Sequence, residues 1–541
     1  MKLKKIIYFS IPLIIIVFLG VYLFYPLSSD KYRIETEEAL INAKNTYLQE
    51  VVKTDTARKP NIIIILADDL GKTDISLFGN PNLQTPNIDA IGKEGAIFTE
   101  AYVTSPICAP SRAGLLTGRY QQRFGMEFQP QPVYPKNRFE YLYGKYFIYG
   151  VKENAFSLSE ELEFPTQEQI HKQGLPLSEI TLADIFKKYH YQTAIIGKWH
   201  LGYEEPFIPL KRGFDYQYGF YEAFSLYADS AQAGIVNQTV DEFADKFVWE
   251  KGRKGPHAIC RNHQVIEEKE YLTDEIAKEA IQFIDKNKDK PFFLYIPFSA
   301  PHTPFQATKA YYDKYAHIKD PYQRIYFAMI HCLDDAVGSI MTKLKKEGLD
   351  ENTIVFFASD NGGATYTKAT TNDPLKGGKF TNLEGGLNVP MMVRWKKQIK
   401  AGTVFTQPVF LLDIFATATA AINAQLPKDR KYDGVDLIPF LKNKENTKVP
   451  HQYICWRNGY AKAIRKGDWK LIIDDKTQKK YLYNLKEDKN EKNNLISQKN
   501  SIADELFKQL QSWEKELKAP LWPYVMNFEF KVGEEVFYFA I

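Results

Sequence analysis

Apolar and polar residues alternate in blocks along most of the chain. From residue 61 onward, continuous apolar runs of strand length are separated by stretches in which apolar residues recur with helical spacing. Continuous runs are typical of strands buried on both faces, and the intervening periodicity is typical of amphipathic helices. The clearest predicted strands cover residues 61–69, 191–200, 291–302 and 352–363. This alternation predicts an α/β fold with a large, mostly parallel sheet sandwiched by helices.

The pattern changes after about residue 445. The segments "YAKAIRKGDWKLIID" and "KKYLYNLKED" are typical of an antiparallel pair or meander, and "SIADELFKQLQSWEKELK" is typical of an amphipathic helix. We therefore predict a large domain over residues 59–445 and a smaller C-terminal α+β domain, with an antiparallel sheet, over residues 446–541.

A basic N-terminus precedes the longest apolar run of the chain. Three early lysines are followed by an apolar segment at residues 6–26, long enough to cross a bilayer at about 1.5 Å per residue. The basic end is expected to stay in the cytoplasm, with the body exported to the periplasm or another extracytoplasmic space. Because no clear small-x-small cleavage motif follows, a membrane anchor is favoured over a cleaved signal peptide within residues 1–28. Residues 29–58 are expected to form a stalk or helix between the anchor and the body.

The overall charge is nearly balanced. The chain has 70 Lys plus Arg and 66 Asp plus Glu, a formal net charge of +4, which gives no support to a nucleic-acid partner. Aromatic residues make up 14%, a content that fits either a Tyr- and Phe-rich core or surfaces that stack on sugar rings. The four cysteines are too few for a disulfide framework in a chain of this size; they are Cys108, Cys260, Cys332 and Cys455.

Polar side chains follow each of the four predicted strands. In chain order they are Asp68 and Asp69, Lys198 and His200, His302, and Asp360 and Asn361. In an open α/β sheet the site forms at the carboxyl ends of the strands, so these side chains converge if the four strands are neighbours. The oxygen ligands among them suit a hard divalent cation such as Ca²⁺ or Mg²⁺. Taken singly, each aspartate could instead cap the helix that follows it.

The stretch "SPICAPSRAGLLTG", residues 105–118, contains the cysteine that is hardest to explain. Pro110 suits the first turn of a helix, which puts Cys108 just ahead of the helix N-terminus. A thiol there is expected to have a lowered pKa, so a cysteine nucleophile is one interpretation, with Arg112 holding an anion. The other local interpretation is a capped loop around a buried cysteine.

The segment "CAPSRAGLLTG" resembles the C-x-P-S-R-x-x-x-[ST]-G signature of formylglycine-dependent sulfatases in the alkaline phosphatase superfamily. The similarity continues through "NIIIILADDLG", "GKWHLG", "APHTPF", "SDNGG", "LKGGKFTNLEGG" and "LYNLKEDKNEKNNL", in the family's order, over roughly residues 60–500. The resemblance implies an alkaline phosphatase-like sheet and makes residues 59–445 the catalytic domain.

The resemblance also implies a chemistry for Cys108. In this family a maturation enzyme oxidises the cysteine to formylglycine, an aldehyde that hydrates to a gem-diol. One diol oxygen attacks the ester sulfur and expels the alcohol, leaving a sulfated enzyme. Loss of the second hydroxyl's proton then re-forms the aldehyde and releases sulfate, a route closed to a serine or a thiol.

Roles for the other residues follow from the same resemblance. One Ca²⁺ is implied, with ligands Asp68, Asp69, the modified Cys108, Asp360 and Asn361. Arg112 and Lys198 would stabilise the diol, and His200 would assist collapse of the sulfated diol. His302 and Lys379 would contact the sulfate, with His302 as the acid for the leaving oxygen.

Two segments depart from the family pattern or extend it. The family often places an arginine after "EGG", where this chain has Asn388, which suggests a change behind the site rather than a loss of activity. Residues 121–175 are rich in Tyr and Phe and follow the signature helix directly. They are expected either to wall the substrate cleft and stack on sugars or to form a packed surface excursion.

These features favour an exported sulfatase that acts on a sulfated carbohydrate. One alternative is a phosphonate monoester or phosphodiester hydrolase that uses the same aldehyde. The other is a non-catalytic sulfated-glycan binding protein, which the intact set of candidate catalytic residues argues against; the set comprises Cys108, Arg112, Lys198, His200, His302 and Lys379.

Overall fold

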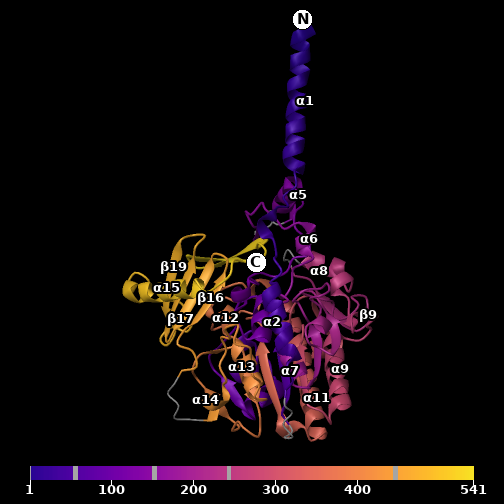
Figure 1. Cartoon of the computed structure of the whole chain (residues 1–541), viewed down its shortest axis with the longest axis vertical. Coiled ribbons are helices and arrows are strands. Elements are labelled where there is room, and N and C mark those ends of the chain that lie inside the picture. Colours follow the sequence, from indigo (N-terminus) through magenta and orange to yellow (C-terminus); the bar gives the residue numbers. More distant parts are fainter. Residues whose placement is uncertain (1, 53–58, 149–154, 241–244, 443–448) are drawn as a thin grey trace.

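The structure, a computed structural model, describes residues 2–52, 59–148, 155–240, 245–442 and 449–541. The predicted domain boundary at 445/446 and the end of the predicted stalk, residues 53–58, lie outside the described residues. Figure 1 shows a large body crossed by a sheet, a smaller sheet beside it, and one helix, α1 (Lys2–Phe24), that projects away from both.

The body is built on a mixed ten-stranded sheet with a parallel centre. Its five central strands, in spatial order, are β12 (Thr353–Ser359), β1 (Asn61–Ala67), β10 (Phe292–Pro297), β5 (Gln192–Lys198) and β6 (Tyr216–Phe220). Each of these strands is parallel to its neighbours within this group. The four predicted strands are therefore confirmed as neighbours, and their fully buried runs explain the continuous apolar segments.

Shorter strands extend the sheet at both edges. Next to β12 lie β13 (Met391–Arg394), β2 (Ala96–Phe98) and β14 (Thr403–Phe405), and beyond β6 lie β8 (Cys260–Arg261) and β9 (Gln264–Val265). The pairs β12–β13, β13–β2, β6–β8 and β8–β9 are antiparallel, which makes the sheet mixed rather than wholly parallel.

Helices cover both faces of the sheet because alternate residues of each central strand point to opposite sides. On one face Ile63 and Ile65 pack with α3 (Pro86–Lys93), α9 (Leu272–Asn287) and α11 (Pro321–Lys346). On the other face the neighbouring positions of β1 pack with a second set of helices: α4 (Cys108–Thr117), α7 (Leu182–Lys188) and α13 (Leu412–Ala420). The predicted sandwich of a sheet between helices is confirmed.

A second, antiparallel sheet confirms the predicted C-terminal α+β region. It consists of β16 (Ile454–Asn458), β17 (Ala461–Lys466), β18 (Trp469–Asp474) and β19 (Lys479–Asn484), and α15 (Asn500–Glu514) packs on it (Figure 1).

A third sheet joins distant parts of the chain and was not predicted. Strand β4 (Phe156–Leu158), from the aromatic-rich segment 121–175, pairs with β20 (Met526–Val532), which pairs in turn with β21 (Glu535–Ala540). Ile107, the residue before the signature cysteine, belongs to the apolar cluster that forms on this sheet, together with Phe156, Phe380, Ala461, Phe528, Phe539 and Ile541.

The N-terminal region includes two helices that precede the sheet. In α1 the described side chains begin at residue 11, so the prediction for residues 6–26 lies partly outside them. Among the described residues, no helix combines the length and the apolar character that a membrane crossing requires. Helix α2 (Glu38–Gln49) lies against α7, where buried Lys44 pairs with Asp184 at 3.1 Å, so this part of the expected stalk is packed on the body.

The remaining described helices and strands are short. They are α5 (Arg138–Tyr143), α6 (Gln167–Ile170), α8 (Asp245–Lys251), α10 (Lys309–Lys314), α12 (Glu384–Leu387), α14 (Ile438–Lys442), β3 (Ala101–Tyr102), β7 (Ile235–Gln238), β11 (Phe305–Thr308) and β15 (Val409–Phe410).

Candidate active site

The polar ends of the four predicted strands meet at one edge of the sheet. Strands β12, β1, β10 and β5 are consecutive, and the ladder between β1 and β12 continues as the Asp360 N–H donates to Ala67 at 3.1 Å. Potential ligand atoms of Asp68, Asp69, Cys108 and His302 all lie within 4.8 Å of one another, and all four residues are buried. The structure thus brings together residues that are up to about three hundred positions apart in the chain.

Oxygen atoms from two strand ends form one wall of this site. The Asp69 N–H donates to Asp360 Oδ1 at 3.3 Å, and Asn361 Nδ2 donates to Asp69 Oδ1 at 2.7 Å. Asn361 Oδ1 is buried and accepts no hydrogen bond from any described residue. Three buried carboxylates and an unpartnered amide oxygen make a donor set that fits a hard divalent cation.

Three cationic side chains face these carboxylates. Lys198 Nζ lies 2.6 Å from Asp68 Oδ2, and Lys379 Nζ lies 2.8 Å from Asp69 Oδ1. Arg112 donates through Nε to Asp360 Oδ2 at 2.8 Å and lies 3.4 Å from Asp68 through a terminal nitrogen. All are buried, so each charge is offset by a partner rather than by water.

Asp68 and Asp360 have different charged neighbours, so their pKa values shift in opposite directions. Burial raises the pKa of Asp68, but the charges of Lys198, His302 and Arg112 outweigh it and hold that pKa well below its usual range. Burial and the charge of Asp68 raise the pKa of Asp360 to about 7.

Cys108 is the first residue of α4, with Ile107 as the N-cap, so the helix begins at the cysteine rather than just after it. Its side chain is 1% exposed, and Sγ lies 3.5 Å from Asp68 Oδ1 and 3.8 Å from Asp69 Oδ1. Burial raises the pKa of the thiol even though Lys198 and Lys379 act in the opposite direction. The expectation of a lowered thiol pKa was therefore wrong, because burial beside carboxylates outweighs the helix N-terminus.

The ring nitrogens of His302 and His200 differ in their hydrogen bonds. His302 Nδ1 lies 2.6 Å from the Thr303 carbonyl, which can only accept, so Nδ1 carries the proton and Nε2 accepts from Lys379 Nζ at 3.1 Å. Burial and the charge of Lys379 lower the pKa of His302 to about 4. His200 has a buried Nδ1 without a partner among the described residues, and burial with the charge of Lys198 lowers its pKa.

Two of these residues occupy strained backbone conformations. Asp69 has φ +60° and His200 has φ +59°, in the left-handed region that non-glycine residues rarely adopt. Such strain persists only where the surrounding structure holds it, and here it turns both side chains into the site.

A cavity of about 360 Å³ opens onto the site, and His200 and His302 form part of its lining. The segment 121–175 contributes Gln129 to Val133, so the expectation that it walls the cleft holds for these residues. None of the segment's described aromatic side chains lines the cavity; the Phe and Tyr rings there are those of Phe224, Tyr366 and Phe380.

Sequence reasoning missed part of this lining, above all Glu222, Phe224 and His257. The signal for Glu222 was present, because "YQYGF" forms the fifth parallel strand, β6, and the acid follows its carboxyl end. The strand is short and carries a glycine, so its pattern is weaker than those of the four longer runs.

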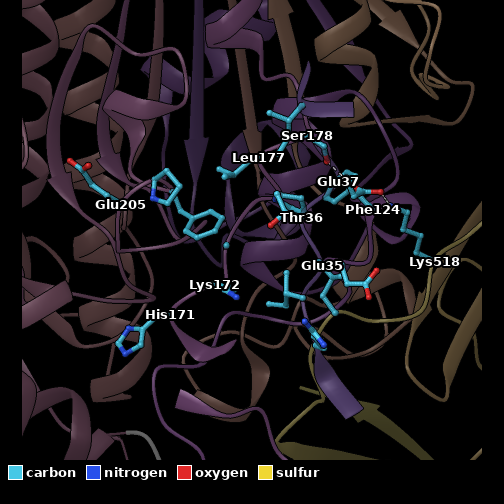
Figure 2. A pocket seen from close by; sticks show the side chains of 18 residues that line it. Glu35, Thr36, Glu37, Phe124, His171, Lys172, Leu177, Ser178, Glu205 and Lys518 are labelled. Atoms are coloured by element: carbon cyan, nitrogen blue, oxygen red, sulfur yellow. Dashed lines mark hydrogen bonds and ion pairs between the residues drawn. The ribbon is translucent and has the colours of Figure 1, made fainter. Parts of the chain in front are cut away.

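A larger cavity, of about 450 Å³, lies elsewhere (Figure 2). Its lining includes Glu35, Glu37, Phe124, His171 and Lys518, and Glu37 pairs with Lys518 across it. It contains none of the predicted site residues, so the cleft at the strand ends is the candidate active site.

Asn388 lies behind the site rather than in it. It accepts a hydrogen bond from Lys72 Nζ at 2.9 Å, and its Nδ2 donates to Glu384 Oε2 at 3.1 Å. Asn388 thus contacts a half-buried lysine and a buried glutamate rather than a predicted site residue, which agrees with the expectation that the change at this position lies behind the site.

Comparisons with known proteins agree with this geometry. The profile of the Sulfatase family matches residues 60–424, and a second profile, N-sulphoglucosamine sulphohydrolase, C-terminal, matches residues 379–517. The chain is 32% identical over 422 residues to N-acetylgalactosamine-6-sulfatase of Mus musculus, covering 76% of this chain and 72% of the relative.

Solved structures include close matches to the whole fold. Ps i-CgsB, in complex with k-i-k-neocarrahexaose, is 32% identical with a TM-score of 0.71, covering 86% of this chain and 95% of that one. The phosphonate monoester hydrolase of Agrobacterium radiobacter has a TM-score of 0.58 at 17% identity, covering 85% and 96% of the two chains, a likeness of fold alone.

The buried position of Arg112 generates a prediction about stability. Arg112→Ala leaves Asp360 without its main cationic partner, and we expect a loss of about 3–5 kcal/mol in the free energy of unfolding. Urea unfolding followed by tryptophan fluorescence would measure it. The control is Arg261→Ala, whose ion pair with Glu279 is partly exposed and whose loss is expected to cost about 1 kcal/mol or less. Equal losses in the two variants would contradict the importance of burial at Arg112.

Proposed function

The chain belongs to the sulfatase family and hydrolyses sulfate esters, and from this premise we propose that its substrate is a sulfated carbohydrate and its nucleophile a formylglycine made from Cys108. The observation that carries the proposal is the place of Cys108, buried at the start of α4 between two carboxylates and within the reach of three cations. The proposal requires a maturation enzyme that oxidises Cys108, and this enzyme would be a partner of the protein.

The carbohydrate assignment is supported by relatives and by the cleft. A relative is named for its action on N-acetylgalactosamine sulfate, and a similar structure holds a neocarrahexaose. The cavity combines the aromatic rings of Phe224 and Tyr366 with the polar groups of Gln129 and Glu222. Sugars present ring faces and hydroxyls, which this combination is suited to bind.

The proposed roles of the side chains follow from their contacts. When Cys108 carries the hydrated aldehyde, it supplies one hydroxyl to attack sulfur and a second hydroxyl that loses its proton, so that the aldehyde re-forms and sulfate leaves with the first oxygen. Lys198 and Arg112 oppose the negative charge that develops beside the nucleophile. His200 Nδ1, neutral and unpartnered, is the proposed proton acceptor.

His302 and Lys379 are proposed to bind the sulfate and to protonate the leaving oxygen as a pair. His302 Nε2 receives a hydrogen bond from Lys379 Nζ, and the pKa of His302 is lowered to about 4 by burial and by the charge of Lys379. Near neutral pH, before substrate enters, the proton of this pair therefore resides on Lys379.

We propose Ca²⁺ as the cation of the site. The residues that would hold it are Asp68, Asp69, Asp360, Asn361 and the modified Cys108. The ion would offset negative charge on a sulfate oxygen and on the nucleophile. We also propose that the body is exported and held at the membrane by residues 6–26, in keeping with the basic and apolar pattern of the N-terminus.

The nucleophile is tested by the mass of the tryptic peptide "EGAIFTEAYVTSPICAPSR", residues 94–112, from protein made in its native host. We expect the mass of the aldehyde, together with turnover of 4-nitrophenyl sulfate that Cys108→Ala abolishes. An unmodified thiol in a fully active preparation would overturn the aldehyde.

The metal is tested by its removal and by altered ligands. After chelation we expect Ca²⁺ to restore activity, and Asn361→Ala to weaken Ca²⁺ affinity by about tenfold or more. Calorimetric titration with Ca²⁺ gives the affinity without relying on turnover. Asp373→Asn, at an exposed position outside the cage, is the control. Recovery with Mg²⁺ but not with Ca²⁺ would refute the assignment.

The anchor is tested by fractionation of the native host. The full chain is expected in the membrane fraction after an alkaline carbonate wash, and a variant without residues 2–26 in the soluble fraction if it is made. Detection of the N-terminal peptides in the isolated protein shows that the segment is retained. A protein whose first residue lies after residue 26 would instead have a cleaved signal peptide.

A further inference from the structure

The fifth parallel strand carries an acidic residue to the edge of the site. Strands β5 and β6 pair in parallel with Lys198 opposite Phe220, and the ladder continues past both strands as the His200 N–H donates to Tyr221 at 3.1 Å. Glu222 therefore stands beside His200, two residues beyond the end of its own strand as His200 is beyond the end of β5. Both residues line the same cavity.

Glu222 is a buried acid that forms no ion pair with any residue in the described part of the chain. The residue is 7% exposed, and from the described residues its side chain accepts a single hydrogen bond, from the neighbouring Ala223 N–H to Oε2 at 2.7 Å. Among the described residues, no other side chain forms a hydrogen bond or an ion pair with Glu222, although Lys251 lines the same cavity. Its other oxygen, Oε1, therefore has no protein donor among the described residues, and a group that enters the cavity can donate a hydrogen bond to it.

A second acceptor lies on the same wall. His257 Nδ1 lies 2.8 Å from the Phe224 carbonyl, so Nδ1 carries a proton, and in the neutral ring Nε2 is left as an acceptor. The ring stacks on Phe224 with centroids 4.2 Å apart, which fixes its plane. Glu222 and His257 together present acceptors to the cavity next to an aromatic face.

We propose that Glu222 is the substrate-recognition carboxylate of the cleft, accepting a hydrogen bond from a free sugar hydroxyl that neighbours the sulfated position. The inference rests on the proposed carbohydrate substrate. A hydroxyl donates to the open oxygen of Glu222, whereas a second sulfate or a carboxylate at that position carries like charge and has no proton to donate. The enzyme therefore takes esters flanked by free hydroxyls and rejects esters flanked by a second anion.

The test compares three kinds of probe in the holoenzyme. The probes are 4-nitrophenyl sulfate, monosulfated sugars (N-acetylgalactosamine, galactose, glucosamine and fucose sulfates), and the same sugars with a second sulfate on a neighbouring hydroxyl. Values of kcat and KM are measured for the wild type, Glu222→Ala, Glu222→Gln and the control Glu205→Gln. Glu205 lines the other cavity and is partly exposed.

We expect the wild type to prefer monosulfated over disulfated sugars. In Glu222→Ala the kcat/KM for the monosulfated sugar, relative to that for 4-nitrophenyl sulfate, falls by about tenfold or more, mainly through KM, because a hydrogen bond to a charged group is lost. Glu222→Gln keeps the shape of the side chain and one acceptor but removes its charge. In this variant the ratio of kcat/KM for the monosulfated sugar to kcat/KM for the disulfated sugar is expected to be smaller than in the wild type. Glu205→Gln leaves both ratios unchanged.

Two results would overturn the inference: ratios that stay within about twofold of the wild type in Glu222→Ala, or a wild type that prefers disulfated sugars. Thermal unfolding of each variant identifies a folding defect, and the isosteric Glu222→Gln keeps the test open if Glu222→Ala does not fold. A wild type that cleaves 4-nitrophenyl sulfate but no sugar sulfate refutes the carbohydrate substrate and this inference, while the sulfatase activity stands. A wild type that cleaves none of the probes refutes the proposed function itself.

Discussion

Three carboxylates paired with three cations inside the protein are the constraint on which the rest of the site depends. Asp68, Asp69 and Asp360 could not be buried alone, because an unpaired charge in the interior costs several kcal/mol. Their partners Arg112, Lys198 and Lys379 come from three separate elements of the chain, and all of them must arrive at one edge of the sheet. The parallel centre of the sheet supplies that edge, since its strands all end on the same side. The carboxylates can therefore be buried only when the fold also brings their cationic partners to the same edge of the sheet.

Much of this arrangement could be predicted, because strands buried on both faces appear in the sequence as continuous apolar runs. Their runs, such as "NIIIILADD", are apolar throughout and end abruptly in polar residues, so both the strands and the residues at their ends could be identified. The sequence alone could not show which segments that are distant in the chain lie next to each other in the fold. The pairing of β4 with β20 joins Leu158 to Met526, and no local pattern specifies a contact at such a separation. The thiol pKa was missed for a related reason: a helix N-terminus can be read from sequence, but the burial that overrides its effect cannot.

The cleft is built from two kinds of structure: the ends of the central strands and the segments that form its walls. The candidate catalytic residues lie mostly at strand ends in the centre of the sheet, where Asp69 and His200 are held in conformations that cost about 1–3 kcal/mol each. The walls come from elsewhere: from Gln129 to Val133, from the segment that follows β6, and from Tyr366 and Phe380. Loops on a fixed scaffold tolerate change better than the scaffold itself. Selectivity among sulfate esters can accordingly change through the walls while the residues at the strand ends stay the same.

The apolar cluster around Ile107 sets an order of events during synthesis. Its members Phe528 and Phe539 belong to β20 and β21, which come long after Cys108 in the chain, and they pack with Ile107, the residue that precedes Cys108. Before those strands arrive, the start of α4 lacks part of its cover; afterwards the thiol is 1% exposed. The proposed modification of Cys108 would therefore have to take place on the growing or still unfolded chain. A chain that folded before this proposed step would enclose an unmodified thiol, because the residues that cover the start of α4 come from a distant part of the sequence.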